Sequence, residues 1–293
     1  MNETPKTQKK ILENPFVGSL VVPIAIVLVG ALIIFGVTKM LSSERSYKDL
    51  VNELQSKTFG NKWVAAYELS KQINSSQIPE AEYPWLIQNL TEAYKGAADP
   101  RTKGFIVAAM GSLKTDLALP MFQVSIADPD LDVQFHTIVA LANSRKGINF
   151  DWKPVLNILN LTGDEYLSIK QAAILTLATH RVSEAQVPIQ KLLSDSNPLL
   201  RYSAATGLIN YKDEVALPVL VNILNMSYPK SGEIVLPPAL DSKQISDLKL
   251  GVLMAVKSNN WNKLNNAILD MAQKDQDTSL ALKAKELLKE LKN

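Results

Sequence analysis

The sequence predicts an all-α protein in which a right-handed α-solenoid of about seven helical hairpins follows a single transmembrane helix. Three observations predict this fold class. Apolar residues recur at helical spacing along most of the chain, prolines that open apolar runs recur at intervals in the thirties, and one long uncharged stretch lies near the N-terminus. The predicted organisation is a polar tail over 1–15, a transmembrane helix over 16–41 and the solenoid over 42–293.

The predicted transmembrane helix includes Phe16–Thr38, a run without a charged residue. A helix of this length spans about 35 Å and can cross a hydrocarbon core of about 30 Å. A cleaved signal peptide is the alternative, but its apolar region would be shorter, and no Ala-x-Ala-like site follows Phe35. Three lysines and the α-amino group precede the run, and Lys39, Arg45 and Lys48 follow it, so a small excess of positive charge favours an internal N-terminus. We therefore expect a single-pass protein of the bacterial cytoplasmic (inner) membrane, with the solenoid on the periplasmic side.

The repeated unit is clearest in the stretch that begins at Asp195. Asp195 or Asn197 can accept hydrogen bonds from the first free backbone N–H groups of a helix, and Pro198 suits a first helical position. Leu200 and Ala204 then fall on one face at helical spacing. The pattern predicts a polar turn followed by a helix.

Partner helices begin with a proline and an apolar run. These prolines are Pro84, Pro120, Pro154, Pro188 and Pro218, separated by 36, 34, 34 and 30 residues. A period in the thirties is typical of stacked helical pairs. In the last pair, one side of the second helix carries an apolar stripe and the other side carries lysines and glutamates, as the exposed end of an array requires. The predicted hairpins cover about 46–74, 84–114, 118–144, 152–180, 185–211, 216–257 and 261–292.

The small residues Ser203, Ala204, Ala205 and Gly207 would let a neighbouring helix come close. With the preceding turn, they resemble the second helix of a HEAT repeat, in the short variety shared with bilin-lyase-like proteins. The resemblance covers about 250 residues and implies scaffolding or assembly, with no catalytic residue to carry over.

Arg201 matches the arginine that HEAT repeats commonly direct toward the carboxylate of a neighbouring turn. Gln134 and Lys170 occupy the equivalent positions elsewhere in this sequence. A continuous ladder of aspartate and arginine is therefore not expected here.

Composition and motifs provide no basis for catalysis. The chain has no cysteine, and its 31 basic and 29 acidic residues give a net charge of +2, without the basic excess that nonspecific phosphate binding needs. Nucleotide-binding and hydrolase motifs are absent from the sequence. We therefore expect a non-enzyme without a cofactor, small-molecule substrate or nucleic-acid partner.

Metal binding is also not expected. The segment from Asp128 to Asp132 alternates carboxylates as a calcium loop does, but it lacks the glycine and glutamate that such a loop requires, so helix capping is the favoured interpretation. The only two histidines, His136 and His180, lie in different repeats without a ligand partner at helical spacing. We expect His180 to interact with a helix C-terminal dipole.

Two features could contact a partner. One is a set of tryptophans near helix starts, for which core packing or a hydrophobic staple is favoured over anchoring: Trp63, Trp85, Trp152 and Trp261. The other is an insertion over 226–241 inside the sixth hairpin. Local packing is favoured there too, but a binding role stays open. Its candidate partner contacts are Tyr228, Glu233, Ile234, Val235, Leu236, Pro237 and Pro238.

The predicted function is that of a membrane-anchored protein-interaction scaffold, an accessory or assembly subunit of a membrane protein complex. The physical reason is that stacked hairpins offer an extended surface to one long partner. Two alternatives remain open from the resemblance: a bilin-lyase-like enzyme of chromophore attachment and a HEAT-like nucleic-acid-binding protein.

Overall fold

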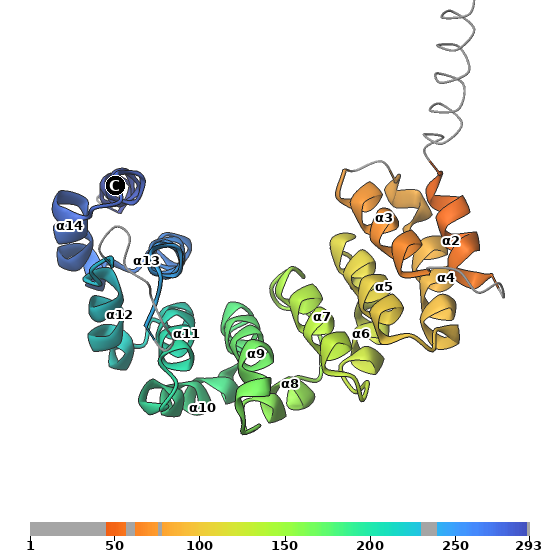
Figure 1. Ribbon diagram of the computed structural model, residues 1–293, viewed down its shortest axis with the longest axis horizontal. Helices are drawn as coiled ribbons and strands as arrows, with labels where there is room; N and C mark the ends of the chain where they lie inside the picture. The colour runs from red at the N-terminus through yellow and green to blue at the C-terminus, as the bar shows by residue number, and fades with distance from the viewer. Residues whose placement is uncertain (1–44, 57–61, 76–77, 230–238, 292–293) are drawn as a thin grey trace, which may run out of the picture. The chain divides into compact units, whose positions relative to one another are not determined.

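The computed structural model describes residues 45–56, 62–75, 78–229 and 239–291 (Figure 1). These residues form helices joined by turns, without a strand among them. The chain divides after Asp49, and the second unit, Leu50–Asn293, contains the array of hairpins.

Seven helical hairpins follow one another along the described chain, which confirms the all-α solenoid and the predicted hairpin positions to within a few residues. The hairpins are α2 (Tyr47–Gln55) with α3 (Lys62–Asn74), α4 (Tyr83–Gly96) with α5 (Pro100–Ser112), α6 (Leu119–Ser125) with α7 (Leu131–Ala142), α8 (Lys153–Ile158) with α9 (Leu167–Thr179), α10 (Gln186–Lys191) with α11 (Pro198–Leu208), α12 (Leu217–Leu224) with α13 (Ser242–Asn259), and α14 (Asn265–Lys274) with α15 (Thr278–Glu290).

Side chains in the turns start several second helices. Asp130 accepts hydrogen bonds from the first amides of α7, and Asn197 accepts one at the start of α11, whose first residue is Pro198. Asp241 and Gln244 form a reciprocal capping box at α13. These contacts satisfy backbone donors that a helix start leaves unpaired. The carboxylates after Asp128 therefore include a helix cap, as the sequence predicted.

The hairpins place the even-numbered helices in one layer and the odd-numbered helices in the other (Figure 1). Small residues bring consecutive odd-numbered helices close together. A Cβ at Gly111 of α5 would lie 2.6 Å from the Ala140 Cβ of α7, and one at Gly207 of α11 would lie 3.2 Å from the Ile174 Cγ2 of α9. Ala204 is fully buried. The predicted close approach at small residues is confirmed.

The helix α15 has the two faces that the sequence predicted for it. Leu280, Ala284 and Leu287 of α15 are buried, and the lysines and glutamates of the same helix are exposed.

None of the described helices combines the length and the apolar character needed to cross a membrane. The stretch 16–41, predicted as the transmembrane helix, lies outside the described residues.

Candidate functional site

A row of aromatic side chains crosses three consecutive odd-numbered helices, and we call it the aromatic row. The Phe105 ring of α5 lies 6.1 Å from Trp63 and 5.5 Å from Tyr67, both on α3, measured between ring centroids. On the other side it lies 5.9 Å from His136 of α7, which lies 6.1 Å from Phe135. Its five members, Trp63, Tyr67, Phe105, Phe135 and His136, thus come from three different hairpins.

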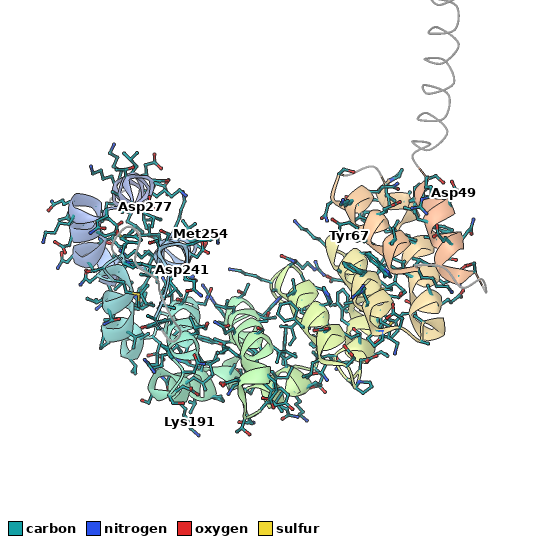
Figure 2. The ribbon with its side chains drawn as sticks, in the orientation of Figure 1. Asp49, Tyr67, Lys191, Asp241, Met254 and Asp277 are labelled. Carbon is teal, nitrogen blue, oxygen red and sulfur yellow. The ribbon has the colours of Figure 1, made fainter. Side chains whose placement is uncertain are left out.

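Helical spacing and one glycine produce this arrangement. Trp63 and Tyr67 are four residues apart, so they share a face of α3. Gly104 leaves room for the ring of His136, because a Cβ at this position would lie 2.6 Å from the His136 Cδ2. Tyr67 is 40% exposed (Figure 2), and the other four rings are half-buried. The aromatic row is therefore partly accessible to solvent.

Two cations lie against the row at its α3 and α5 end. The Arg101 guanidinium carbon lies 5.3 Å from the centroid of the Trp63 ring, and the Lys71 Nζ lies 4.3 Å from that of Tyr67. Both cations are exposed. Such contacts stabilise a positive charge over the negative face of a ring. The sequence favoured core packing for Trp63, and the contact between hairpins could not be seen from it.

The two histidines lie in separate places. Burial lowers the pKa of His136, and the nearby Asp132 offsets this in part. The Nε2 of His180 lies 2.7 Å from the carbonyl oxygen of Leu141, in the last turn of α7. Burial also lowers the pKa of His180, and its Nδ1 is buried without a hydrogen-bond partner. His180 thus contacts a helix C-terminus as predicted. The helix is α7 of the preceding hairpin and not α9, which His180 itself follows.

Acidification below about pH 6.5 is expected to destabilise the protein, because both histidines have a lower pKa in the folded state than in the unfolded chain. As the pH falls below the histidine pKa of the unfolded chain, toward the lower histidine pKa values of the folded protein, the unfolded chain binds protons first. Melting temperatures measured between pH 8 and pH 5 should fall for the wild type. His136→Gln with His180→Gln should show a smaller fall, and an equal fall would contradict the expectation.

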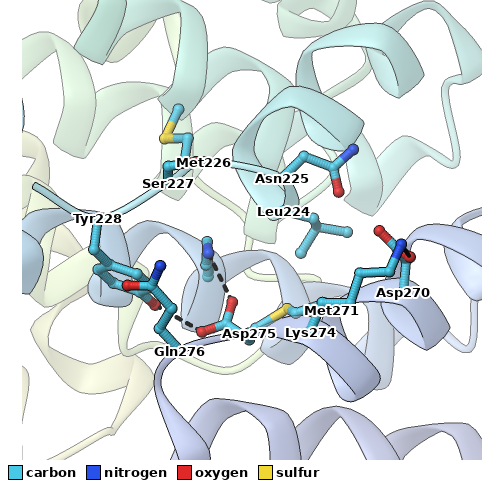
Figure 3. A pocket seen from close by; sticks show the side chains of 11 residues that line it. Leu224, Asn225, Met226, Ser227, Tyr228, Asp270, Met271, Lys274, Asp275 and Gln276 are labelled. Carbon is cyan, nitrogen blue, oxygen red and sulfur yellow. Dashed lines mark hydrogen bonds and ion pairs between the residues drawn. The ribbon is translucent and has the colours of Figure 1, made fainter.

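A second candidate site lies where the chain leaves α12. A cavity of about 230 Å³ opens between this segment and the end of α14 (Figure 3). Two residues that line it form an ion pair: the Lys249 Nζ lies 2.7 Å from the Asp275 Oδ2, and both side chains are at most 3% exposed. The Tyr228 hydroxyl donates to the Asp275 Oδ1 over 3.0 Å, and the Lys249 Nζ lies 4.5 Å from the centroid of the Tyr228 ring.

The charges around this cavity neutralise one another. Lys249 pairs with Asp275, and Lys274 pairs with Asp270. Burial raises the pKa of the Tyr228 hydroxyl, and Asp275 raises it further, so the hydroxyl stays protonated and donates. The geometry is that of a joint between the sixth and seventh hairpins. It offers no unpaired charge among the lining residues to a charged ligand.

In four odd-numbered helices a basic residue lies eleven positions before a residue with a positive φ angle. That residue is at or just after the end of the helix. The pairs are Lys103 with Lys114, Lys170 with Arg181, Arg201 with Lys212, and Lys249 with Asn260.

Only two of these four reach the carboxylate of the next hairpin. Lys103 lies 2.9 Å from Asp128 and Lys249 lies 2.7 Å from Asp275, measured between Nζ and Oδ2. Lys170 and Arg201 instead donate to carbonyl oxygens in the turns of their own hairpins, those of Leu161 and Asp195. The expectation that the ladder is not continuous is confirmed, and its two complete rungs use lysine.

Other predicted positions have mixed outcomes. Among the candidate partner contacts, Glu233–Pro238 lie outside the described residues, and a partner contact at Tyr228 stays a prediction. Of the remaining tryptophans, Trp261 is buried as predicted, Trp152 packs on His180, and Trp85 is 37% exposed. In the part of the chain that the structure describes, no three His, Asp or Glu side chains are grouped to hold a metal ion.

Comparisons with known proteins identify the class of fold. Residues 153–230 match the family model of HEAT repeats. The X-ray structure of YibA from Escherichia coli, a structural-genomics target, is similar with a TM-score of 0.52 and 14% sequence identity, covering 85% of this chain and 83% of YibA. No curated protein matches the sequence. The chain therefore has a HEAT-like α-solenoid fold, and the likeness to YibA extends to the fold alone.

Proposed function

We propose that this protein is a membrane-anchored scaffold that binds a protein partner through the aromatic row and serves in the assembly of a membrane complex. A HEAT-like array is consistent with a protein-interaction scaffold. The observation that carries the proposal is the contact between five rings from three hairpins, with Tyr67 exposed at one end.

The chemistry of the row suits a protein interface. Tyrosine, tryptophan and arginine dominate the energetics of such interfaces, because large rigid side chains bury much area at little entropic cost. The row contains the first two, and Arg101 lies on it. Binding through these groups requires no reaction, which agrees with the expectation of a non-catalytic role.

Mutation of the row should release the partner while the fold persists. We expect Tyr67→Ala in the full chain, purified from its native host in mild detergent, to lose most of a partner that the wild type retains. Trp85→Ala is the matched control, because Trp85 is an aromatic residue of similar exposure, 37% against 40%, in the even-numbered layer. Equal retention by the two variants, at unchanged melting temperature, would exclude the row as the binding surface.

The membrane part of the proposal depends on the uncharged run Phe16–Thr38 and the lysines before it. We expect the full chain to stay in the membrane pellet after alkaline carbonate extraction. Protease added to spheroplasts should digest the solenoid while a cytosolic control protein stays intact. Complete protection of the solenoid would reverse the proposed orientation, and release by carbonate would contradict the anchor.

A further inference from the structure

We infer that the aromatic row binds an extended peptide segment that has one or two carboxylates at one end and apolar anchor residues after them, with the carboxylates at Arg101 and Lys71. This inference rests on the proposed function and specifies the partner's chemistry. Three features support it: the charge at one end of the row, the apolar surface beyond the other end, and the spacing of the helices.

The cationic end has unused donors. Arg101 has five N–H donors and Lys71 has three, and neither side chain hydrogen-bonds or ion-pairs with a residue that the structure describes. Each instead lies over an aromatic ring. Asp99 is the carboxylate near Arg101, but its oxygens already accept hydrogen bonds from the amides of Arg101 and Thr102 and from the Thr102 hydroxyl. A carboxylate from outside can therefore bind here without displacing an existing ion pair.

The surface becomes apolar toward the following helices. Val139 of α7 is 38% exposed, and Leu175 of α9 is 42% exposed. The only charged side chain of α9 is that of Lys170, which is buried and donates to Leu161. At the α7 end, Asp132 lies one helical turn before His136, and its exposed carboxylate would repel a second acid. The acidic end of a partner is thus favoured at α3 and α5, and its apolar part at α7 and α9.

Helix spacing sets the spacing of the anchors. Packed helices lie about 8–10 Å apart, and an extended chain advances about 3.3–3.6 Å per residue, so one helix step corresponds to about three residues. The steps from α3 through α5 and α7 to α9 therefore fit a segment of about nine residues. One or two acidic residues should precede apolar residues at about every third position.

A labelled nine-residue peptide tests this directly. The probe has two aspartates at one end and phenylalanine at every third position after them, and its partner probe replaces both aspartates with lysines. Both are also made in the reverse sequence order, since the chain direction of the partner is open. Fluorescence anisotropy is measured with the full chain in detergent. We expect the acidic probe in one order to bind about tenfold more tightly than the lysine probe, as a charge-assisted contact of this kind requires.

Variants assign the effect to the row. Arg101→Gln should weaken the acidic probe about tenfold and should not weaken the lysine probe, because a charge-assisted hydrogen bond to the carboxylate is lost. Arg101→Lys should retain part of the affinity, and Trp85→Ala should retain all of it. Circular dichroism of each variant verifies the fold, and Lys71→Gln provides a second test should Arg101→Gln unfold.

The outcomes separate this inference from the proposed function. Equal binding of acidic and lysine probes, or no binding of either, would overturn the partner chemistry. If the partner chemistry is overturned but Tyr67→Ala still releases the native partner, the proposed scaffold function stands and only the inferred peptide chemistry is wrong. If the acidic probe binds but Tyr67→Ala retains the native partner, the row is a peptide site and the partner binds elsewhere.

Discussion

Replacing Asp275 with alanine is expected to lower the free energy of unfolding by about 3–5 kcal/mol, because Lys249 would remain as a buried charge without its partner. The side chains of Lys249 and Asp275 are 3% and 1% exposed, so solvent screens them little. Asp275 also accepts hydrogen bonds from the Tyr228 hydroxyl and the Asp277 amide. Chemical denaturation of the wild type and of Asp275→Ala measures the difference.

An exposed ion pair and a double mutant provide the controls. The pair of Lys243 and Asp247 is 83% and 61% exposed, so solvent screens it and Asp247→Ala should change stability far less than Asp275→Ala. Lys249→Met combined with Asp275→Ala should recover part of the loss, because it removes the unpaired charge. A loss at Asp275 as small as that at Asp247 would show that the pair is solvated.

Alanine at Gly111 is expected to destabilise the protein, since the new methyl group overpacks the contact between α5 and α7 at a cost of about 1–3 kcal/mol. It would lie 2.6 Å from the Ala140 Cβ and 2.9 Å from the Ala140 Cα, so the backbone of α7 must move. The higher helix propensity of alanine offsets only about 1 kcal/mol of this. The same shift would disturb the aromatic row, because His136 lies one helical turn before Ala140.

Gly251 of α13 provides the opposite case. A Cβ there meets nothing within 4 Å, so Gly251→Ala should stabilise the protein by about 1 kcal/mol through helix propensity. Thermal unfolding of the two variants should move in opposite directions. Stabilisation by both substitutions would contradict the close packing of α5 on α7.

The hairpins could be predicted because their signals are local. A proline at the start of a first helix and a capping side chain before the second are both visible in the sequence, and Asn197 with Pro198 shows this clearly. The small residues that bring odd-numbered helices together follow the same period. Stacking of units against their neighbours then completes the fold.

The aromatic row could not be predicted in the same way. Helical periodicity shows that Trp63 and Phe105 lie on faces of their helices, but not that the faces meet across two hairpins. The complete ladder rungs were missed for a related reason. Lys103 lies four residues after the cap Asp99, whereas Lys249 lies eight after Asp241, so counting from the helix start separates them. Both lysines lie eleven residues before the residue with positive φ at the end of their helix, so counting back from that residue aligns them.

Photo-crosslinking in native membranes tests the central claim most directly. A photoreactive amino acid placed at position 67 of the full chain lies at the exposed end of the aromatic row, and one placed at position 85 lies at a surface of similar exposure in the other layer. We predict that illumination yields a discrete protein adduct from position 67, weakened by Arg101→Gln, and none from position 85. An adduct from position 85 with none from position 67 would contradict the assignment of the aromatic row as the partner-binding surface.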